Sequence, residues 1–295
     1  MTRLAAGLIA LAAFTLPAAA QTPSPRTSLI QADQAASQAV LHRGIIDGLS
    51  GVLDDSAVFL YEGAQVTSGK ERIIRLLTAQ RSMIPARMQW FPVIVAIAQD
   101  GHFGVTSGAT ALGVSGQPPD STLHFGHYIA AWRRAENGPW RIVALLENGL
   151  ADPDSLVLPE PWRLDPGPVA ISASGRPFAQ ADLEFARLAA DSGAPLAFYR
   201  WAAPDMTTPP GTGIVVVGPA AMRARMEGGP LAKAAWEWHP VWSAAAESGD
   251  LAVTVGLSRI STGSDAYIGK YLTVWRRQPD GSIRFILDSG NDRPK

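Results

Sequence analysis

The sequence predicts an α+β protein made of two tandem domains, each with a group of helices packed on an antiparallel sheet. Two observations support this prediction. In residues 29–149, segments with helical spacing come before most of the segments with strand-like alternation, an order typical of helices gathered on one face of a sheet. Residues 126–149 then recur as residues 269–290, and each copy has two alternating apolar runs around a polar turn, ENG or PDG. This pattern is that of a β-hairpin, so the repeat indicates a duplicated domain.

Length and composition limit the function classes that the chain could serve. It has 295 residues, 47% of them hydrophobic and 17% charged, which is enough for two globular domains. The formal net charge is −1 and the basic residues are scattered, which argues against nucleic acid or anionic lipid as a partner. The chain has no cysteine, so disulfides, thiol nucleophiles and thiolate metal sites are excluded.

Residues 1–20 have the features of a signal peptide. Arg3 precedes an apolar run of about 13 residues, and Pro17 is followed by three alanines, so we expect cleavage after about Ala20. The apolar run is shorter than the roughly 20 residues that a membrane-spanning helix needs. The predicted mature protein is therefore periplasmic or secreted, with no stable membrane insertion after processing. Residues 21–28 are expected to be a disordered lead-in, because they are mostly polar and contain two prolines.

The first domain is predicted to cover residues 29–149. Apolar residues recur at helical spacing up to about residue 53, and the glycines near residues 44–48 divide this stretch into two helices. The remaining elements are expected in this order: a short strand at 54–59, a helix from Gly69, strands at 88–95 and 103–114, and the hairpin at 126–149.

Residues 150–177 are predicted to be a linker, because they contain six prolines, which disfavour regular structure and stiffen a connection. The second domain is predicted to cover residues 178–292 and to repeat the whole order of the first. The two domains can be matched at individual positions: Asp33 with Asp182, Trp90 with Trp238, Thr106 with Thr254, Tyr128 with Tyr271, and Trp132 with Trp275.

Two of these motifs identify a resemblance. Asp54-Asp55 before the first strand, and the Tyr-x-x-x-Trp-Arg-Arg hairpin from Tyr271, resemble the nuclear transport factor 2-like superfamily, in particular its SnoaL-like and ketosteroid-isomerase-like branch. The resemblance implies two cone-shaped domains, each a strongly curved sheet wrapped against about three helices with a pocket between them. It also implies dimerisation through the outer sheet face, so we expect an internal pseudo-dimer and a monomeric chain. This fold hosts enzymes, ligand carriers and assembly domains alike.

The candidate ligand-binding residues are aromatic. Strand alternation places Tyr128 and Trp132 on one face, which the resemblance makes the pocket side. These rings could stack a flat apolar ligand, although packing of an ordinary core is the simpler interpretation. The candidates from both domains are Tyr128, Trp132, Trp90, Tyr271, Trp275 and Trp238.

The catalytic residues that the resemblance implies are absent from both domains. The expected acidic base falls on Leu60 and on Pro209 or Pro210, and the other two roles fall on Ala36, Ala186, Ala130 and Thr273. Three other carboxylates could stand in as candidate catalytic groups, namely Glu62, Glu147 and Asp288. A buried carboxylate that faces a pocket and has a raised pKa would favour an enzyme.

No metal or cofactor is expected. His124 and His127 are three residues apart, which on a strand directs them to opposite faces, and no phosphate-binding loop or serine elbow occurs. The sequence therefore favours an exported protein that binds a small apolar or aromatic molecule, or a protein partner, without catalysis. The alternative is a cofactor-free isomerase or dehydratase that acts on a hydrophobic carbonyl compound.

Overall fold

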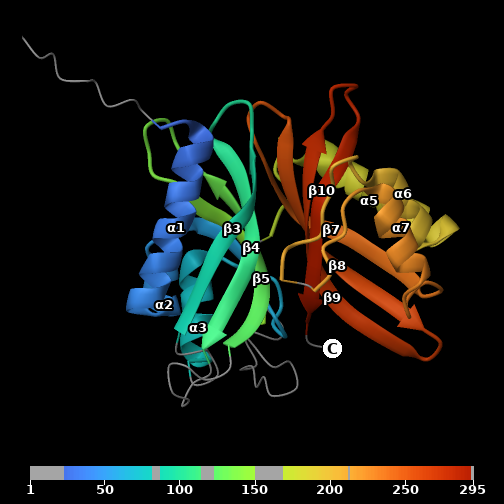
Figure 1. Ribbon diagram of the computed structural model, residues 1–295, viewed down its shortest axis with the longest axis horizontal. Helices are drawn as coiled ribbons and strands as arrows, with labels where there is room; N and C mark the ends of the chain where they lie inside the picture. Colours follow the sequence, from blue (N-terminus) through green and yellow to red (C-terminus); the bar gives the residue numbers. More distant parts are fainter. Residues whose placement is uncertain (1–22, 82–86, 114–122, 150–168, 212, 294–295) are drawn as a thin grey trace, which may run out of the picture.

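The computed structural model describes residues 23–81, 87–113, 123–149, 169–211 and 213–293 (Figure 1). The predicted signal peptide and most of the predicted linker lie outside these residues. None of the described helices is both long enough and apolar enough to cross a membrane. Residues 23–149 are called the first half below, and residues 169–293 the second half.

The first half is a six-stranded sheet with three helices on one face. The strand order is β2-β1-β6-β5-β4-β3, and every neighbouring pair is antiparallel except β1 with β6. The helices are α1 (Pro25–Arg43), α2 (Ile45–Ser50) and α3 (Lys70–Ala79). The strands are β1 (Leu53–Tyr61), β2 (Thr67–Ser68), β3 (Arg87–Ile97), β4 (Phe103–Gly113), β5 (Leu123–Arg133) and β6 (Arg141–Asn148).

The first helix begins inside the stretch that was expected to be a lead-in. The Ser24 hydroxyl accepts a hydrogen bond from the Thr27 amide at 3.1 Å, and Pro25 occupies the first turn, where its missing N–H costs nothing. The prediction of a disordered segment up to residue 28 is therefore wrong. The predicted division into two helices is confirmed at Gly44, whose φ of 81° ends α1.

The second half has four strands, in the order β10-β9-β8-β7, all antiparallel. The sequence predicted a full repeat, but within the described residues no strand corresponds to β1 or β2. The segment that would form β1 contains Pro204, Pro209 and Pro210, which lack the amide hydrogen that a ladder needs, and it makes only isolated bridges. The elements are α5 (Arg176–Ser192), α6 (Ala194–Trp201), α7 (Pro219–Glu227), β7 (Ala235–Ala245), β8 (Leu251–Thr262), β9 (Asp265–Arg277) and β10 (Ile283–Asp292).

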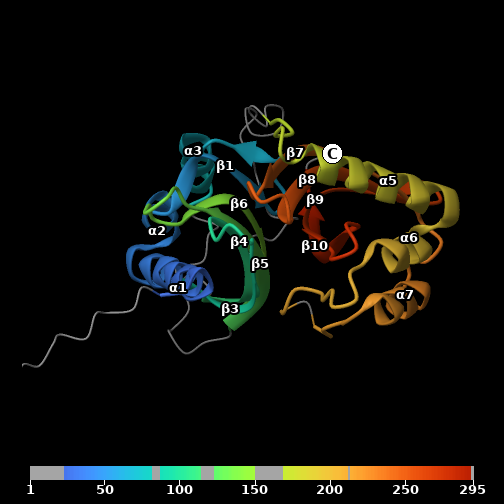
Figure 2. The ribbon, with the colours of Figure 1, turned by 90° about the horizontal axis from the view of Figure 1, so that it is seen from above.

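The two curved sheets face each other and the helices lie on the outer sides (Figures 1 and 2). The facing surfaces are apolar: Val105 and Ile129 of the first half belong to the same buried cluster as Val253 and Val274 of the second. All four side chains are inaccessible to solvent. The predicted α+β class, with curved sheets and three helices in each half, is thus confirmed.

Polar contacts join the two sheets at both ends of this apolar surface. At one end, the Asn291 amide donates to the Leu60 carbonyl at 3.0 Å. At the other end, the Ser248 amide donates to the Asp100 carboxylate, and the Gln99 amide donates to the Asp250 carboxylate, each at 3.1 Å. The halves are therefore held face to face within one chain, and the predicted monomeric state stays a prediction.

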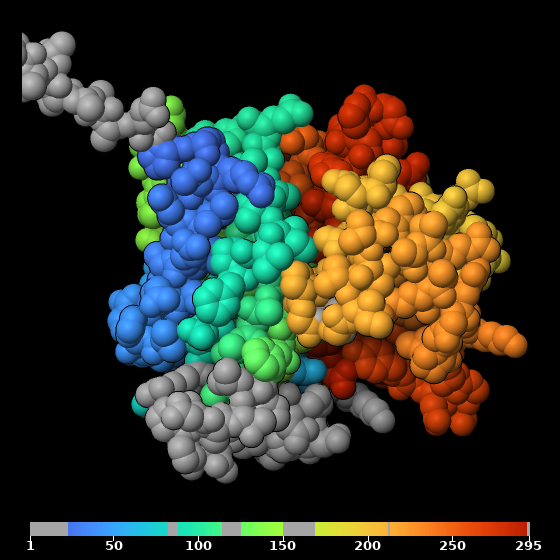
Figure 3. All heavy atoms as spheres, viewed as in Figure 1, coloured from blue at the N-terminus to red at the C-terminus, as the bar shows by residue number. Residues whose placement is uncertain are grey.

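The second half also contacts the first through the loop before α7. Figure 3 shows this light orange segment lying against the green strand β5. The approach requires glycine: Gly211 has a φ of 98°, and a Cβ atom on it would lie 2.3 Å from the carbonyl oxygen of Gly126.

Candidate ligand-binding site

A buried aspartate organises the inside of the first half. Asp33, on α1, accepts three hydrogen bonds at its carboxylate: from Trp90 Nε1 at 2.9 Å, from Thr106 Oγ1 at 2.5 Å, and from the Tyr128 hydroxyl at 3.1 Å. Trp132 Nε1 in turn donates to Thr106 Oγ1 at 2.8 Å. These five residues, called the Asp33 network, tie the first helix to three strands.

The second half contains the same network at the matching positions. Asp182, on α5, accepts from Trp238 Nε1 at 2.9 Å, from Thr254 Oγ1 at 2.7 Å and from the Tyr271 hydroxyl at 3.0 Å. Trp275 Nε1 donates to Thr254 Oγ1 at 2.8 Å. We call this set the Asp182 network.

Both central carboxyl groups are inaccessible to solvent. Burial raises the pKa of Asp33 to about 6 and that of Asp182 to about 7, while the hydrogen bonds that each accepts act in the opposite direction. Burial and the neighbouring aspartate also raise the pKa of the Tyr128 and Tyr271 hydroxyls well above the usual value. Near neutral pH each network therefore holds a carboxyl group close to its titration range.

The six aromatic residues predicted to bind a ligand are all members of these networks. Trp132 and Trp275 are fully buried, so neither can stack against a ligand. Their aspartate partners were paired in the sequence but not recognised as site residues. The missed signal is that Asp33 lies four residues after Leu29, on the buried stripe of α1.

The two halves differ in the space beside the network. The second half has a cavity of about 400 Å³ between its sheet and all three of its helices. Its apolar wall is formed by Phe185, Phe198, Met222, Met226, Trp236 and Trp238. The equivalent space in the first half is a hollow of about 10 Å³, about the size of one water molecule.

The packing of one helix accounts for much of this difference. In the first half, Ile73, Leu76 and Leu77 of α3 are fully buried and fill the space over the sheet. In the second half, α7 buries only Met222. Its other side chains leave the cavity open beneath the helix.

The floor of the cavity differs from the first half in its chemistry as well. On adjacent strands, Asp288 lies directly across from Thr273, and the same register in the first half pairs Leu145 with Ala130. The Thr273 hydroxyl donates to Asp288 Oδ1 at 2.5 Å. Burial raises the pKa of Asp288 to about 6, opposed by this hydrogen bond. Of the three carboxylates predicted as candidate catalytic groups, Asp288 is the one that lies in the wall of this cavity.

Most hydrogen-bond donors around the cavity are already used. The Tyr271 hydroxyl and Trp238 Nε1 both donate to Asp182 while that group is ionised, and the Thr273 hydroxyl donates to Asp288. Asp288 Oδ2 accepts a hydrogen bond from none of the described residues. The polar surface of the cavity therefore mainly accepts hydrogen bonds.

Three further polar side chains line the cavity: Ser258, Tyr267 and Lys270. The Tyr267 hydroxyl donates a hydrogen bond to the Asp292 carboxylate. The Ser258 hydroxyl lines the cavity and can donate or accept. Lys270 also lines it, but strand alternation directs its side chain to the opposite face from Tyr271, where the amine donates to the Asp292 carbonyl. That carbonyl also accepts from the Gly63 amide of the first half, so the amine lies at the junction of the halves. Burial lowers the pKa of Lys270 to about 7.

The other two predicted carboxylates lie elsewhere. Glu147 is fully buried beside the small hollow of the first half and accepts from Thr110 Oγ1 at 3.1 Å. Its counterpart in the second sheet is Gly290, not Asp288, because Tyr128 pairs with Glu147 and Tyr271 pairs with Gly290. Glu62 is partly buried where the halves meet and accepts from the Gly149 amide at 3.0 Å, away from both hollows.

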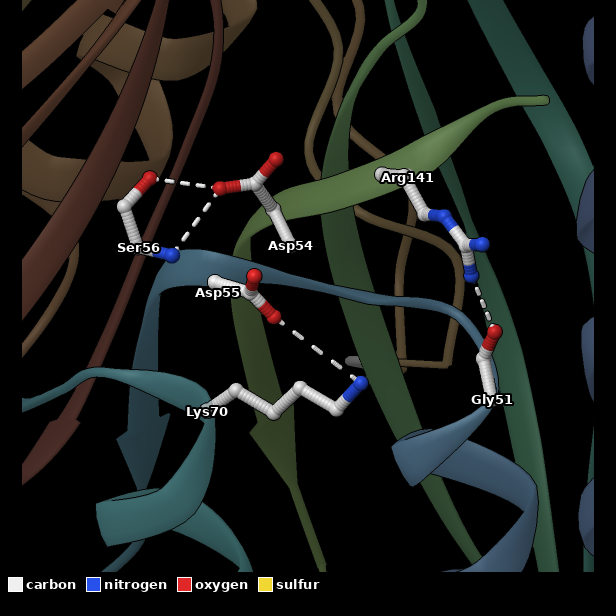
Figure 4. A network of polar contacts seen from close by, with 6 residues as sticks. All are labelled: Gly51, Asp54, Asp55, Ser56, Lys70 and Arg141. Carbon is white, nitrogen blue, oxygen red and sulfur yellow. Dashed lines mark hydrogen bonds and ion pairs between the residues drawn. The ribbon is translucent and has the colours of Figure 1, made fainter. Parts of the chain in front are cut away.

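The aspartate pair that marked the resemblance has a structural role at the start of β1 (Figure 4). Asp54 accepts from the amide and the hydroxyl of Ser56, at 2.9 and 2.6 Å, and Asp55 lies 4.0 Å from the Lys70 amine at the surface. These contacts lie in the first residues of β1; Asp55 and Lys70 border a hollow at the surface, away from the cavity of the second half. In the described residues, no group of three or more histidine, aspartate or glutamate side chains could hold a metal ion.

Comparison with known proteins yields structural neighbours only. No protein-family model matches the chain, and no curated protein matches it. One neighbour is an NTF2-like protein of unknown function from Pseudomonas putida, at 18% identity and a TM-score of 0.34, covering 41% of this chain and 84% of its own. Another is a ketosteroid isomerase-like protein from Erwinia carotovora atroseptica, at 15% identity and a TM-score of 0.32, covering 40% and 91%.

A third neighbour is an NTF2-like protein with a cystatin-like fold from Novosphingobium aromaticivorans, at 18% identity and a TM-score of 0.32, covering 39% of this chain and 79% of its own. Each neighbour therefore spans about as much of the chain as one half. At these identities and TM-scores, the likeness carries no conclusion about activity.

Proposed function

We propose that the second half binds a small, largely apolar molecule in the cavity beneath α7. The observation that carries this proposal is the contrast in volume, about 400 Å³ in the second half against about 10 Å³ in the first. Ligand sites commonly measure about 300 to 1,000 Å³. Because the two halves share the same internal network, the open space is a feature of one half and not a general consequence of the fold.

The lining supports an aromatic or otherwise flat apolar ligand. Trp236 and Trp238 are only partly buried, and the Phe198 ring lies 5.9 Å and 6.3 Å from them. Phe185 extends this wall, 4.7 Å from the Trp238 ring. Such rings gain most from a ligand that removes their remaining exposed surface from water.

Binding of a neutral fluorescent dye, N-phenylnaphthylamine, tests the proposal on the chain without its predicted signal peptide. Ser258→Trp would place an indole in the cavity, and we expect it to weaken dye binding at least about tenfold. Arg259→Trp is the matched control, because the next residue on β8 points to the opposite face and is exposed. Equal binding by all three proteins would contradict the proposal. Native mass spectrometry would identify any ligand that copurifies.

A second candidate function is proton transfer on a hydrophobic carbonyl compound, as in a cofactor-free isomerase or dehydratase. Asp288 favours it, because a carboxyl group whose pKa is about 6 suits a general base near neutral pH. The Tyr271 and Thr273 hydroxyls already donate to Asp182 and Asp288, and this argues against proton transfer, since a developing oxyanion needs free donors.

Isotope exchange tests this second function directly. If Asp288 acts as a base, the protein should speed exchange of the hydrogens next to the carbonyl of an aromatic ketone such as tetralone, and Asp288→Asn should abolish the effect. The exchange is followed by NMR in deuterated buffer. Equal rates with the wild-type protein, the variant and buffer alone would exclude proton transfer on this substrate.

A further inference from the structure

We propose that the ligand of this cavity carries a protonated amine, held by Asp288, on an aromatic or apolar body. The inference rests on the proposed binding function and narrows it to one chemical class. Three features of the cavity support it: the direction of its hydrogen bonds, its charge, and the nature of its walls.

The hydrogen-bonding groups of the cavity favour a ligand that donates hydrogen bonds. The Tyr271 and Thr273 hydroxyls donate their hydrogen bonds to Asp182 and Asp288, so each offers the cavity only a lone pair. Asp288 Oδ2 accepts from no described residue. A ligand that only accepts hydrogen bonds would leave these oxygens without partners, which is costly in a buried site. An ammonium group has three donors and no acceptor, as this surface requires.

The charge of the cavity favours a cationic ligand. Of the described residues that line it, Asp288 and Lys270 are the charged ones. The Lys270 amine donates to the Asp292 carbonyl on the other face of β9, so it does not pair with Asp288. An ionised carboxylate in an apolar cavity is stabilised by an opposite charge with hydrogen bonds.

The walls suit the rest of such a ligand. Phe198, Trp236 and Trp238 form an aromatic wall in the same cavity as Asp288. Aromatic faces attract cations as well as apolar rings, and desolvation strengthens this attraction. The first half, which has Leu145 in place of Asp288, has no comparable cavity. At this position of the sheet, the acid therefore occurs in the half that has the open space; the carboxylate of the first half, Glu147, lies beside the small hollow and accepts from Thr110.

Three probes of similar shape separate charge from apolar fit: naphthylethylamine, naphthylethanol and naphthylacetate. Their binding is measured by tryptophan fluorescence and calorimetry at about pH 8, where Asp182 and Asp288 are ionised and the amine is protonated. We expect the wild-type protein to bind the amine at least about tenfold more tightly than the alcohol. The acetate, with a like charge, should bind most weakly.

Asp288→Leu and Asp288→Asn test the source of this preference. Leucine occupies the equivalent position in the first half, and asparagine keeps the size of the side chain while it removes the charge. Both variants should bind the alcohol and lose the preference for the amine. Their unfolding midpoints show whether the fold is intact.

The outcomes separate the two proposals. If the wild-type protein binds the alcohol as tightly as the amine, or if the preference survives in both variants, the inference is overturned while cavity binding stands. If no probe binds and dye binding is indifferent to Ser258→Trp, both proposals fall. Preferred binding of the acetate would also overturn the inference, because it would require a cationic group in the cavity.

Discussion

Replacement of Asp182 by asparagine should destabilise the protein and remove a defined part of its pH dependence. The aspartate accepts from Trp238 at one oxygen and from Thr254 and Tyr271 at the other. Asparagine can accept at one oxygen only, so its NH₂ group would face the N–H of Trp238. One buried donor without a partner costs about 1 to 3 kcal/mol, so we expect a loss of about 2 kcal/mol at about pH 8.

The sign of the pH dependence follows from the raised pKa. The carboxyl group of Asp182 has a pKa of about 7 in the folded protein, against an ordinary value of 3.8, so the folded state binds the proton more tightly than the unfolded state. Its contribution to stability is fully present below the unfolded pKa and is lost as the pH rises through about 7. Lowering the pH from about 8 to about 6 should therefore stabilise the wild-type protein by about 1.4 kcal/mol relative to Asp182→Asn.

Urea unfolding followed by tryptophan fluorescence, at a series of pH values, measures this difference. Asp33→Asn is the matched control: the pKa of Asp33 is about 6, so the same change in pH should add only about 0.4 kcal/mol there, and its full effect should appear about one pH unit lower. Parallel pH profiles for the wild-type protein and Asp182→Asn would refute the argument. So would a wild-type protein that loses stability relative to the variant on acidification.

Three further predictions concern single side chains. Asp288→Leu should raise the free energy of unfolding by about 1 kcal/mol near pH 8, because a half-buried carboxylate with a raised pKa is removed; an unchanged or lower urea midpoint would contradict this. His127→Ala should destabilise by about 1 kcal/mol at neutral pH through loss of the 2.7 Å contact with Ser289. Burial lowers the pKa of His127 from 6.5 to about 4, so its contribution is fully present above about 6.5 and should be lost as the pH falls from there towards about 4; a urea series on both proteins checks the sign. Trp132→Phe and Trp275→Phe each remove one 2.8 Å hydrogen bond and should cost similar amounts, about 1 to 2 kcal/mol by thermal unfolding; a large difference would show that the two networks are not equivalent.

Much of the fold could be predicted because local patterns specify it. The recurring hairpin identified two similar sheets, and alternation along the strand placed Tyr128 and Trp132 on the inner face. The number of strands in the second half could not be predicted from the repeat. Matching the two halves position by position did not account for the prolines before α7, which cannot donate the hydrogen bonds of a strand ladder.

The site was harder to predict because its important groups look ordinary in the sequence. An aspartate on a helix usually faces solvent, and only the contacts across the fold show that Asp33 and Asp182 are buried acceptors. The sequence placed Glu147 and Asp288 alike at the end of a closing strand, but β10 continues to Asp292, and the cross-strand partners of the two carboxylates place them two positions apart. Their different cross-strand partners explain why Asp288, and not Glu147, lies in the wall of the large cavity.

The two halves together suggest why a binding site would be carried by only one of them. An open cavity and the Asp288 carboxylate in its wall both lower stability, since each forgoes contacts that a filled core would make. The first half has no comparable cavity, because its α3 fills the space, and Leu145 occupies the position of Asp288. Its own buried carboxyl groups, Asp33 and Glu147, accept hydrogen bonds from Thr106 and Thr110. Its outer sheet face packs against the sheet of the second half and shares one apolar cluster with it. The first half therefore fills its core and packs against the second half, which carries the open cavity.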